Sequence, residues 1–357
     1  MRRSWMTACI LGLAWLCSSA AAAATLQATV AELPGALRSA APGDTIRLKG
    51  DGWGDQRWDH VVKAAPGVVV EPGPGARSVF ASLTISNSEG VGVKGVTFAS
   101  QGAQAVKILS SKRITLEDCE ISGDTKITDG LWVRASTDVT IRGCRLHDLW
   151  HGVFHEANTR LTVEDSDFRE LYSDALRGGR DSDGVIFRRL RITDLHQVGA
   201  DHLDAIQFWT TGATRPTRNV LIEEVVYRRG KGDPAQGVFV GNETNIPYEN
   251  IVVRRFAAVG GLYHGISLSG VTGGVVEDCF LQPMIGGFDA KHRAIDRVWI
   301  QFRRSAGGKA RDNIATSFKS SENMSEPSSS GFKAVAIAKE GDYAALDAWL
   351  ARHRLRP

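Results

Sequence analysis

Two short segments of the chain hold a high density of side chains that could take part in acid–base chemistry. Residues 173–183 read SDALRGGRDSD and residues 199–209 read GADHLDAIQFW. Asp174 and Asp204 occupy equivalent places in these segments, each just before a short apolar run. Two neighbouring carboxylates raise one pKa or bind a cation, and calcium prefers oxygen ligands. We therefore expect Asp174 and Asp201 to bind calcium, with turn formation before a strand as the alternative for the aspartates.

A histidine and several basic side chains accompany these carboxylates. His202 is the candidate general base or acid, because imidazole exchanges a proton near neutral pH. The plainer interpretation is a structural or simply exposed histidine. Arg177 and Arg180 are candidates to neutralise a carboxylate on a substrate, and Lys231 could add a further positive charge.

The elements that carry these residues belong to a repeat. Short strands with alternating apolar and polar residues recur every 22–25 residues, apart from two longer steps of 35 and 31 residues. A second short strand recurs between them, and Gly, Asn and Asp separate the strands. Such a pattern predicts a coil whose turns bury their apolar sides by stacking on each other. The strands begin near Val68, Val91, Ile114, Val139, Leu161, Val185, Val220, Ile251, Gly274 and Val298.

The second strands predict one continuous outward strip that contains the candidate residues. Stacking would place Asp174 beside Asp204 and Arg177 beside Gln207. Flat aromatic rings on this strip could bind sugar rings, or they could pack against the two enlarged loops. We expect substrate contacts from Asp204, Gln207, Trp209, His151, His264, Lys231 and Trp132. Phe154 and Phe239 would complete the aromatic set.

The fourth residue of each first strand alternates in charge, from Glu71 and Lys94 through to Glu277. Stacked strands would turn these residues into a ladder of opposite charges that fixes the register of the turns. A basic substrate-binding stripe is the alternative. Two positions further on lies a small or apolar column that includes Cys119 and Cys144, which we expect to be buried, either as thiols or as a disulfide.

The two ends of the chain differ from the repeat. Residues 1–24 have the charged start, apolar middle and small-residue end of a secretory signal peptide, which predicts a periplasmic or secreted protein. Residues 26–48 predict a capping helix and a first strand. We expect the coil over residues 25–310, a Ser-rich flexible connection over 311–340 and a helix over 341–357 that packs on the coil.

Charge and hydropathy exclude some classes of partner. The net charge is +3, and two of these positive charges lie at Arg2 and Arg3 in the predicted signal peptide. This near-neutral balance does not favour nucleic acid or an anionic membrane as a partner. The apolar stretch at the start is too short to span a bilayer, so we expect no membrane insertion. We also expect a monomer.

The repeat resembles the pectate-lyase-like right-handed parallel β-helices over nearly the whole mature chain. HLDAIQ at 202–207 is similar to the NTDGID motif of polygalacturonases, and YHGIS at 263–267 to their GHGIS. DHLD at 201–204 is similar to the Asp-Pro-His motif of alginate epimerases, without the proline. The chain has AQG at 235–237 where polygalacturonases carry two aspartates. The resemblance implies an all-β, single-stranded, right-handed parallel β-helix of about ten rungs, with a capped N-terminus and a short C-terminal helix.

The resemblance also implies a carbohydrate-active enzyme, because its members include polysaccharide lyases, mannuronan C5-epimerases and polygalacturonases. Our first hypothesis is a lyase that cleaves an acidic, uronate-containing polysaccharide by β-elimination, with His202 as base and Arg177 and Arg180 on the carboxylate. The alternatives are a C5-epimerase, a glycoside hydrolase that uses Asp174, Asp181 or Asp204, and a non-catalytic glycan-binding or envelope protein.

Overall fold

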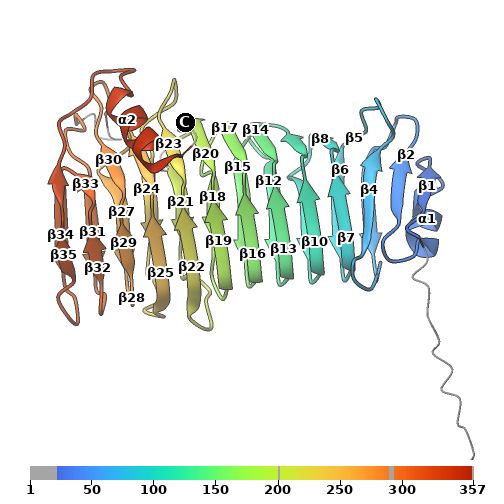
Figure 1. Cartoon of the computed structure of the whole chain (residues 1–357), viewed down its shortest axis with the longest axis horizontal. Helices are drawn as coiled ribbons and strands as arrows, with labels where there is room; N and C mark the ends of the chain where they lie inside the picture. Colours follow the sequence, from blue (N-terminus) through green and yellow to red (C-terminus); the bar gives the residue numbers. More distant parts are fainter. Residues whose placement is uncertain (1–21, 200–201, 289–292, 356–357) are drawn as a thin grey trace, which may run out of the picture.

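The computed structural model describes residues 22–199, 202–288 and 293–355. Over these residues the chain winds as a coil of parallel strands (Figure 1). Each turn passes through three sheets, here named A, C and B, and then continues to the next turn. The all-β fold is therefore as predicted. Sheets B and C each stack eleven strands, so the described coil slightly exceeds the ten expected rungs.

Sheet A carries the charge ladder. Its strands are β1 (Thr25–Ala28), β2 (Thr45–Leu48), β4 (Val68–Pro72), β7 (Glu89–Lys94), β10 (Lys112–Glu117), β13 (Thr137–Arg142), β16 (Thr159–Glu164), β19 (Asp183–Arg188), β22 (Thr217–Glu223), β25 (Tyr248–Arg254), β28 (Val271–Thr272), β29 (Val275–Glu277), β32 (Lys309–Arg311) and β35 (Ser328–Ser330).

Sheet C follows sheet A in each turn. Its strands are β5 (Val79–Phe80), β8 (Thr97–Ala99), β11 (Glu120–Ser122), β14 (Arg145–Leu149), β17 (Asp167–Leu171), β20 (Arg191–Leu195), β23 (Val226–Arg228), β26 (Ala257–Val259), β30 (Phe280–Gln282), β33 (Ile314–Ala315) and β36 (Lys333–Ala334).

Sheet B completes each turn and holds the candidate site. Its strands are β3 (Asp55–Asp59), β6 (Ser82–Ser86), β9 (Gln104–Leu109), β12 (Asp129–Arg134), β15 (His151–Glu156), β18 (Leu176–Gly178), β21 (Asp204–Phe208), β24 (Gln236–Val240), β27 (His264–Ser269), β31 (Trp299–Arg303) and β34 (Ser317–Ser321).

Columns of apolar side chains fill the interior. Ile114 pairs in register with Val139, Val139 with Leu161, and Leu161 with Val185. Each of the four side chains is at most 1% exposed. Burial of one such side chain stabilises a fold by about 1.5–3 kcal/mol. Because a single turn has no second layer to cover it, this stabilisation is obtained only when turns stack.

The alternating charges on the outer side of sheet A form the predicted ladder. The register places Glu117 directly between Lys94 and Arg142. Lys94 Nζ lies 2.7 Å from a Glu117 carboxylate oxygen, and Arg142 contacts the other oxygen at 2.5 Å. The structure extends the ladder by one basic residue at each end, Arg47 and Arg311. Because carboxylates alternate with the arginines, sheet A is not a continuous basic stripe.

A second ladder, which we did not predict, runs along the corner between sheets B and A. Its members are small polar side chains. The oxygen of each accepts the backbone N–H of its counterpart on the preceding turn at 3.0–3.3 Å. Corner N–H groups that the sheets leave unpaired are thereby satisfied. The members are Ser88, Ser111, Ser136, Asn158, Ser182 and Thr217.

The cysteine column faces the interior, as expected. Cys119, Cys144 and Cys279 are buried free thiols, so the disulfide considered for Cys119 and Cys144 is not formed. Burial raises the pKa of the Cys279 thiol to about 12. Thiols of this kind act as small apolar core residues and are poor nucleophiles.

The Ser-rich segment at residues 311–340 corrects our domain boundaries. Strands β33, β34, β35 and β36 pair in parallel with the turn before them, so the coil continues past residue 310 and this segment is not a flexible connection. Strand pairing uses backbone N–H and C=O groups, which serine supplies as well as any residue. A polar sequence can therefore extend a sheet without an alternating apolar signal.

Helices cover the coil at two places. Helix α1 (Leu33–Ser39) lies between β1 and β2 and buries Leu33 and Leu37 against the first turn, as the sequence predicts. Helix α2 (Ala344–His353) lies near the last turns in Figure 1 and packs Trp349 against Phe280 of sheet C. The predicted packing of the C-terminal helix is confirmed. No described helix has the length and apolarity needed to cross a membrane.

Candidate functional site

The outward side chains of sheet B form two columns. The first column includes Asp129 and His151, which are in register, and Asp204, which is in register with Gln236. The second column is continuous from Lys107 to Lys319 through consecutive strand pairs. Its members are Lys107, Trp132, Phe154, Arg177, Gln207, Phe239, Ser267, Gln301 and Lys319. The predicted strip is therefore a real surface of the protein.

Asp174 and Asp204 form a buried carboxyl pair at the centre of this surface. They are 3% and 0% exposed, and the Asp204 backbone N–H donates to Asp174 Oδ1 at 2.9 Å. Burial, followed by the charge of Asp204, raises the pKa of Asp174 to about 8. Burial also raises the pKa of Asp204. At neutral pH Asp174 is therefore protonated, which relieves the repulsion between the two groups.

His202 is joined to this pair. Its Nδ1 lies 3.0 Å from Asp204 Oδ2, and its side chain is 49% exposed. The hydrogen bond that His202 donates to Asp204 raises the pKa of His202 above its ordinary value. When Nδ1–H donates to the carboxylate, the lone pair lies on Nε2, which is the arrangement of an oriented general base. The edge of the ring packs against Phe239, with centroids 5.8 Å apart.

Arg177 lies on the turn before His202. One guanidinium nitrogen is 3.5 Å from Asp174 Oδ2 and also contacts His151 Nε2. His151 Nδ1 in turn lies 2.6 Å from Asp129 Oδ1. With Nε2 accepting from Arg177, the His151 proton is assigned to Nδ1, which donates to Asp129. The polar contacts therefore form one chain across β12, β15, β18 and β21.

The aromatic residues have a different arrangement from the one expected. The Trp132 and Phe154 rings stack with centroids 6.1 Å apart and planes 4° apart. Phe154 and Trp209 stack at 5.8 Å and 29°, and the Arg177 guanidinium carbon lies 4.9 Å from the Trp209 ring centre. The faces of these rings are therefore largely used by each other and by Arg177. This stack supports Arg177 and offers mainly ring edges to a sugar.

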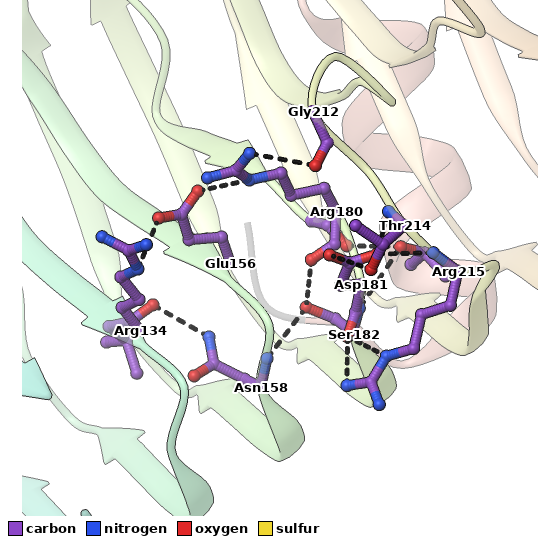
Figure 2. Close-up of polar contacts among 12 residues, drawn as sticks. Arg134, Glu156, Asn158, Arg180, Asp181, Ser182, Gly212, Thr214 and Arg215 are labelled. Atoms are coloured by element: carbon purple, nitrogen blue, oxygen red, sulfur yellow. Dashed lines mark hydrogen bonds and ion pairs between the residues drawn. The ribbon is translucent and has the colours of Figure 1, made fainter. Parts of the chain in front are cut away.

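Arg180 is not part of the chain that contains Arg177. Its Nε donates to Glu156 at 2.6 Å and one terminal nitrogen donates to the Gly212 carbonyl at 3.2 Å (Figure 2). Arg134 binds the other side of the same carboxylate at 3.1 Å. Because Glu156 is 4% exposed, it holds both arginines at the edge of sheet B. The catalytic role of Arg180 stays a prediction, and its contacts in the structure anchor the loop around Gly212.

Asp181 anchors the same loop. Its carboxylate accepts the backbone N–H groups of Thr214 and Arg215 at 2.8 and 2.9 Å (Figure 2). Burial raises the pKa of Asp181, but these bonds and the charge of Arg215 together outweigh burial and lower the pKa. An ionised carboxylate that holds backbone donors is a poor acid for catalysis. The geometry therefore gives Asp181 a structural role.

The remaining predicted contacts lie at varying distances from the centre. Gln207 is half-buried between Arg177 and Phe239 in the second column. His264 Nδ1 accepts from Trp299 Nε1 at 3.2 Å, and burial, with a contribution from Lys319, lowers the pKa of His264 to about 4. Lys231 is exposed on the loop before β24 and is held there by its backbone N–H, which donates to Asp194.

Calcium binding remains a prediction, and the described residues do not favour it. Asp201 lies outside the described residues. Within the described ranges, no group of three or more His, Cys, Asp and Glu side chains is placed to hold a metal. Calcium takes six to eight oxygen ligands. Asp174 Oδ1 and Asp204 Oδ2 already have protein partners, and only the buried Asp204 Oδ1 lacks one, so we derive no catalytic step through calcium.

The comparisons with known proteins identify the fold. Residues 81–204 match the family described as a right handed beta helix region. The chain is a right-handed parallel β-helix protein. The fold is the one that the resemblance in the repeat implied. No curated protein matches this β-helix protein in sequence.

Solved structures agree with this identification. A surface adhesin of Streptococcus pneumoniae, PfbA, is 10% identical, with a TM-score of 0.52 over 82% of this chain and 80% of that chain. A family 28 exopolygalacturonase of Yersinia enterocolitica is 8% identical, with a TM-score of 0.51 over 88% and 79%. A family 6 polysaccharide lyase of Pseudopedobacter saltans is 12% identical, with a TM-score of 0.48 over 90% and 94%.

Sequence identity this low supports similarity of the fold only. Of these solved structures, the two with TM-scores above 0.5 are an adhesin and an exopolygalacturonase, which differ in function. The chemistry of this β-helix protein therefore has to be argued from its own residues.

Two features of this surface were not predicted from the sequence. The role of Asp129 as the partner of His151 required the register of β12 and β15. Lys319 was missed because it lies in the Ser-rich segment that we expected to be flexible. The signal available for Lys319 was the segment SFKSS, in which Phe318 and Lys319 interrupt a run of serines.

Proposed function

We propose that this protein is a polysaccharide lyase that cleaves a uronate-containing polymer by β-elimination. The observation that carries the proposal is the His202–Asp204 pair, placed one turn from Arg177 on the same outward surface. A uronate needs two groups for this reaction, a base for the proton at C5 and a cation for the carboxylate at C6. His202 and Arg177 are of these two types.

The chemical step follows from the properties of these side chains. The His202 Nε2 lone pair takes the C5 proton while Arg177 binds the carboxylate and stabilises the charge that develops there. The C5–H electron pair becomes the C4–C5 double bond, and the bond from C4 to the glycosidic oxygen breaks. That oxygen leaves as a hydroxyl after it accepts a proton from the imidazolium or from water.

The buried carboxyls position these two groups. Asp204 fixes the tautomer and orientation of His202 through Nδ1. Asp174 is protonated at neutral pH and so leaves most of the Arg177 charge available to a substrate. Asp129 and His151 hold the guanidinium from the opposite side. Arg177 is therefore positioned before substrate binds, which lowers the reorganisation needed in the transition state.

A C5-epimerase is the second candidate, and the Asp129–His151 pair favours it. Epimerisation begins with the same proton removal and ends with return of a proton to the other face of C5. His151 is a second imidazole oriented by a carboxylate, on the side of Arg177 away from His202. A hydrolase has less support, because Asp174 and Asp204 are buried, whereas a hydrolase needs an acid and a base that reach its substrate.

The direct test is to incubate the purified protein with alginate, polygalacturonate and glucuronate polymers, each with calcium and with a chelator. We expect a rise in ultraviolet absorbance from the C4–C5 double bond of the product. His202→Ala and Arg177→Ala should abolish the rise, whereas Arg145→Ala, an exposed arginine of sheet C, should not change it.

Other outcomes separate the alternatives. Proton exchange at C5 without the absorbance rise would support the epimerase, and new reducing ends without the double bond would support a hydrolase. Binding without any of these changes would support a glycan-binding protein. We also propose that the protein is exported and monomeric. Signal-peptide cleavage before Thr25 and the mass in solution test these two points.

A further inference from the structure

A hollow lies on the same surface, towards the C-terminal end of sheet B. It has a volume of about 490 Å³ and is lined by residues of β24, β27, β31 and β34. Lys319 lies in the same outward column as Arg177, with an unbroken register of five strand pairs between them. With about 4.8 Å between neighbouring strands, the two positions are about 24 Å apart along the coil.

The charges around the hollow are not balanced. Arg303 is paired with Glu322 at 3.1 Å, and Glu243 accepts the Thr210 backbone N–H at 2.7 Å. Lys319 and Arg304, in contrast, have no carboxylate within ion-pair distance in the described part of the chain. Glu243 contributes one negative charge to the lining, because its partners at Thr210 are neutral, so the two unpaired cations leave the hollow with a net positive charge. A concave surface with net positive charge attracts an anionic group.

Lys319 is held rigidly for such a role. Its Nζ lies 3.1 Å from the centre of the Trp299 ring, as in a cation–π contact. Burial, with a contribution from Arg297, lowers the pKa of Lys319, which indicates an amine that is partly removed from water. Arg304 is held by the Asn242 carbonyl and Ser269 Oγ, both at 3.2 Å.

Neutral polar groups continue from this position towards Arg177. Ser267 and Gln301 follow Lys319 in the column, and both reach the wall of the hollow. His264 accepts from Trp299 through Nδ1, so its proton lies on Nε2, where it can donate to a hydroxyl. The surface therefore offers cations at two positions and neutral hydrogen-bonding groups between them.

We propose that Lys319 and Arg304 form a second carboxylate-binding position, which holds a uronate residue of the same polymer five turns away from Arg177. The inference rests on the proposed function, because it assumes that the polymer is acidic. It adds that the chain runs along the coil and that several sugar residues separate the two bound carboxylates. Long uronate oligomers should then bind much more tightly than short ones.

The test measures binding of uronate oligomers of two lengths by calorimetry. The protein is the full chain with His202→Ala, so that substrate is not consumed, and the probes are trimers and octamers of mannuronate and of galacturonate. We expect Lys319→Ala to weaken octamer binding about tenfold, the loss of one charge-assisted contact. Trimer binding should not change, and Lys319→Arg should retain most of the octamer affinity.

Lys309→Ala is the matched control, because Lys309 is an exposed lysine of the same turns that lies on sheet A. It should leave both affinities unchanged. Equal octamer affinities with and without Lys319 would overturn the second carboxylate-binding position. The lyase proposal is tested separately with a Lys319→Ala protein that keeps His202. Turnover of trimers by that protein would show that the lyase proposal stands. Absence of binding by both oligomers of both sugars would overturn both proposals.

Discussion

Sheet A and sheet B of this β-helix are built from the same repeat, yet they use charge in opposite ways. On sheet A, acidic and basic residues alternate, so that Glu117 has a basic neighbour on each side. On sheet B, Asp174 lies against another carboxyl, Asp204, and both are buried. Charge on sheet A sets the register of the turns. Charge on sheet B is held in a costly arrangement, which is typical of a functional site.

The largest effect that this comparison predicts is on activity alone. His202→Ala and Arg177→Ala should each lower kcat/KM by about 10²–10⁴-fold, because each removes a group that acts on the reacting atoms. Steady-state kinetics on the preferred uronate polymer measure the loss. Thermal unfolding of the same variants should show that the coil is retained. Full activity in a His202→Ala protein would contradict the assignment of the reactive site to sheet B.

The next effect is on stability and depends on pH. The pKa of Asp174 is raised in the folded protein to about 8, from an ordinary value of 3.8. The folded state therefore binds a proton that the unfolded state releases, and this stabilisation is lost as pH rises from about 4 to about 8. Asp174→Asn removes the titrating group. It should stabilise the protein by a few kcal/mol at alkaline pH and by little near pH 4.

Urea unfolding of the wild type and Asp174→Asn across that pH range measures the difference. Asp165→Asn is the control, because Asp165 is an acidic residue at the corner beside the ladder, where it pairs with Arg189. Its substitution should not stabilise the protein at alkaline pH. A constant difference between wild type and Asp174→Asn at all pH values would show that Asp174 does not titrate as described.

A third, smaller effect concerns the His202–Asp204 hydrogen bond. This bond is the main cause of the raised pKa of His202, so the base becomes active only at higher pH. Asp204→Asn should move the acid limb of the pH–rate profile to lower pH and lower the maximal rate about tenfold. The profile of kcat/KM against pH measures both changes. An unchanged limb would show that Asp204 does not control the proton on His202.

Substitutions in the ladder are expected to change stability alone. Glu164 lies between Arg142 and Arg188 in register, and its contact with Arg188 is 2.6 Å. Glu164→Lys would place three positive charges in a row and should destabilise the fold by about 1–3 kcal/mol. Arg47→Ala, at the exposed end of the ladder, should cost less than about 1 kcal/mol. Urea unfolding measures both, and neither should change kcat.

The same comparison explains how much could be predicted from the sequence. The ladder and the two columns of sheet B follow from the period of the repeat, because parallel strands in register place equivalent residues side by side. The pairing of Asp174 with Asp204 was predicted in this way. The coil over residues 311–340 was not, because Ser328–Ser330 pair through backbone groups and give no apolar pattern.

Contacts made by loops that differ from turn to turn could not be predicted from the sequence. Arg180 binds Glu156 and the Gly212 carbonyl, and the loop conformation that brings Gly212 there has no equivalent on other turns. The orientation of the aromatic rings on sheet B could not be predicted from the sequence either. The spacing placed Trp132, Phe154 and Trp209 near each other, but only the structure shows that the rings cover each other's faces.

The most direct test of the central claim is to follow the C5 position of a uronate polymer by NMR in heavy water with the wild type and His202→Ala proteins. The account predicts that the wild type removes the C5 proton and yields an unsaturated end, or deuterium at C5 if the intermediate is reprotonated, and that His202→Ala does neither. An unchanged C5 proton with the wild type on every uronate polymer would contradict the assignment of His202 and Arg177 as the reactive centre.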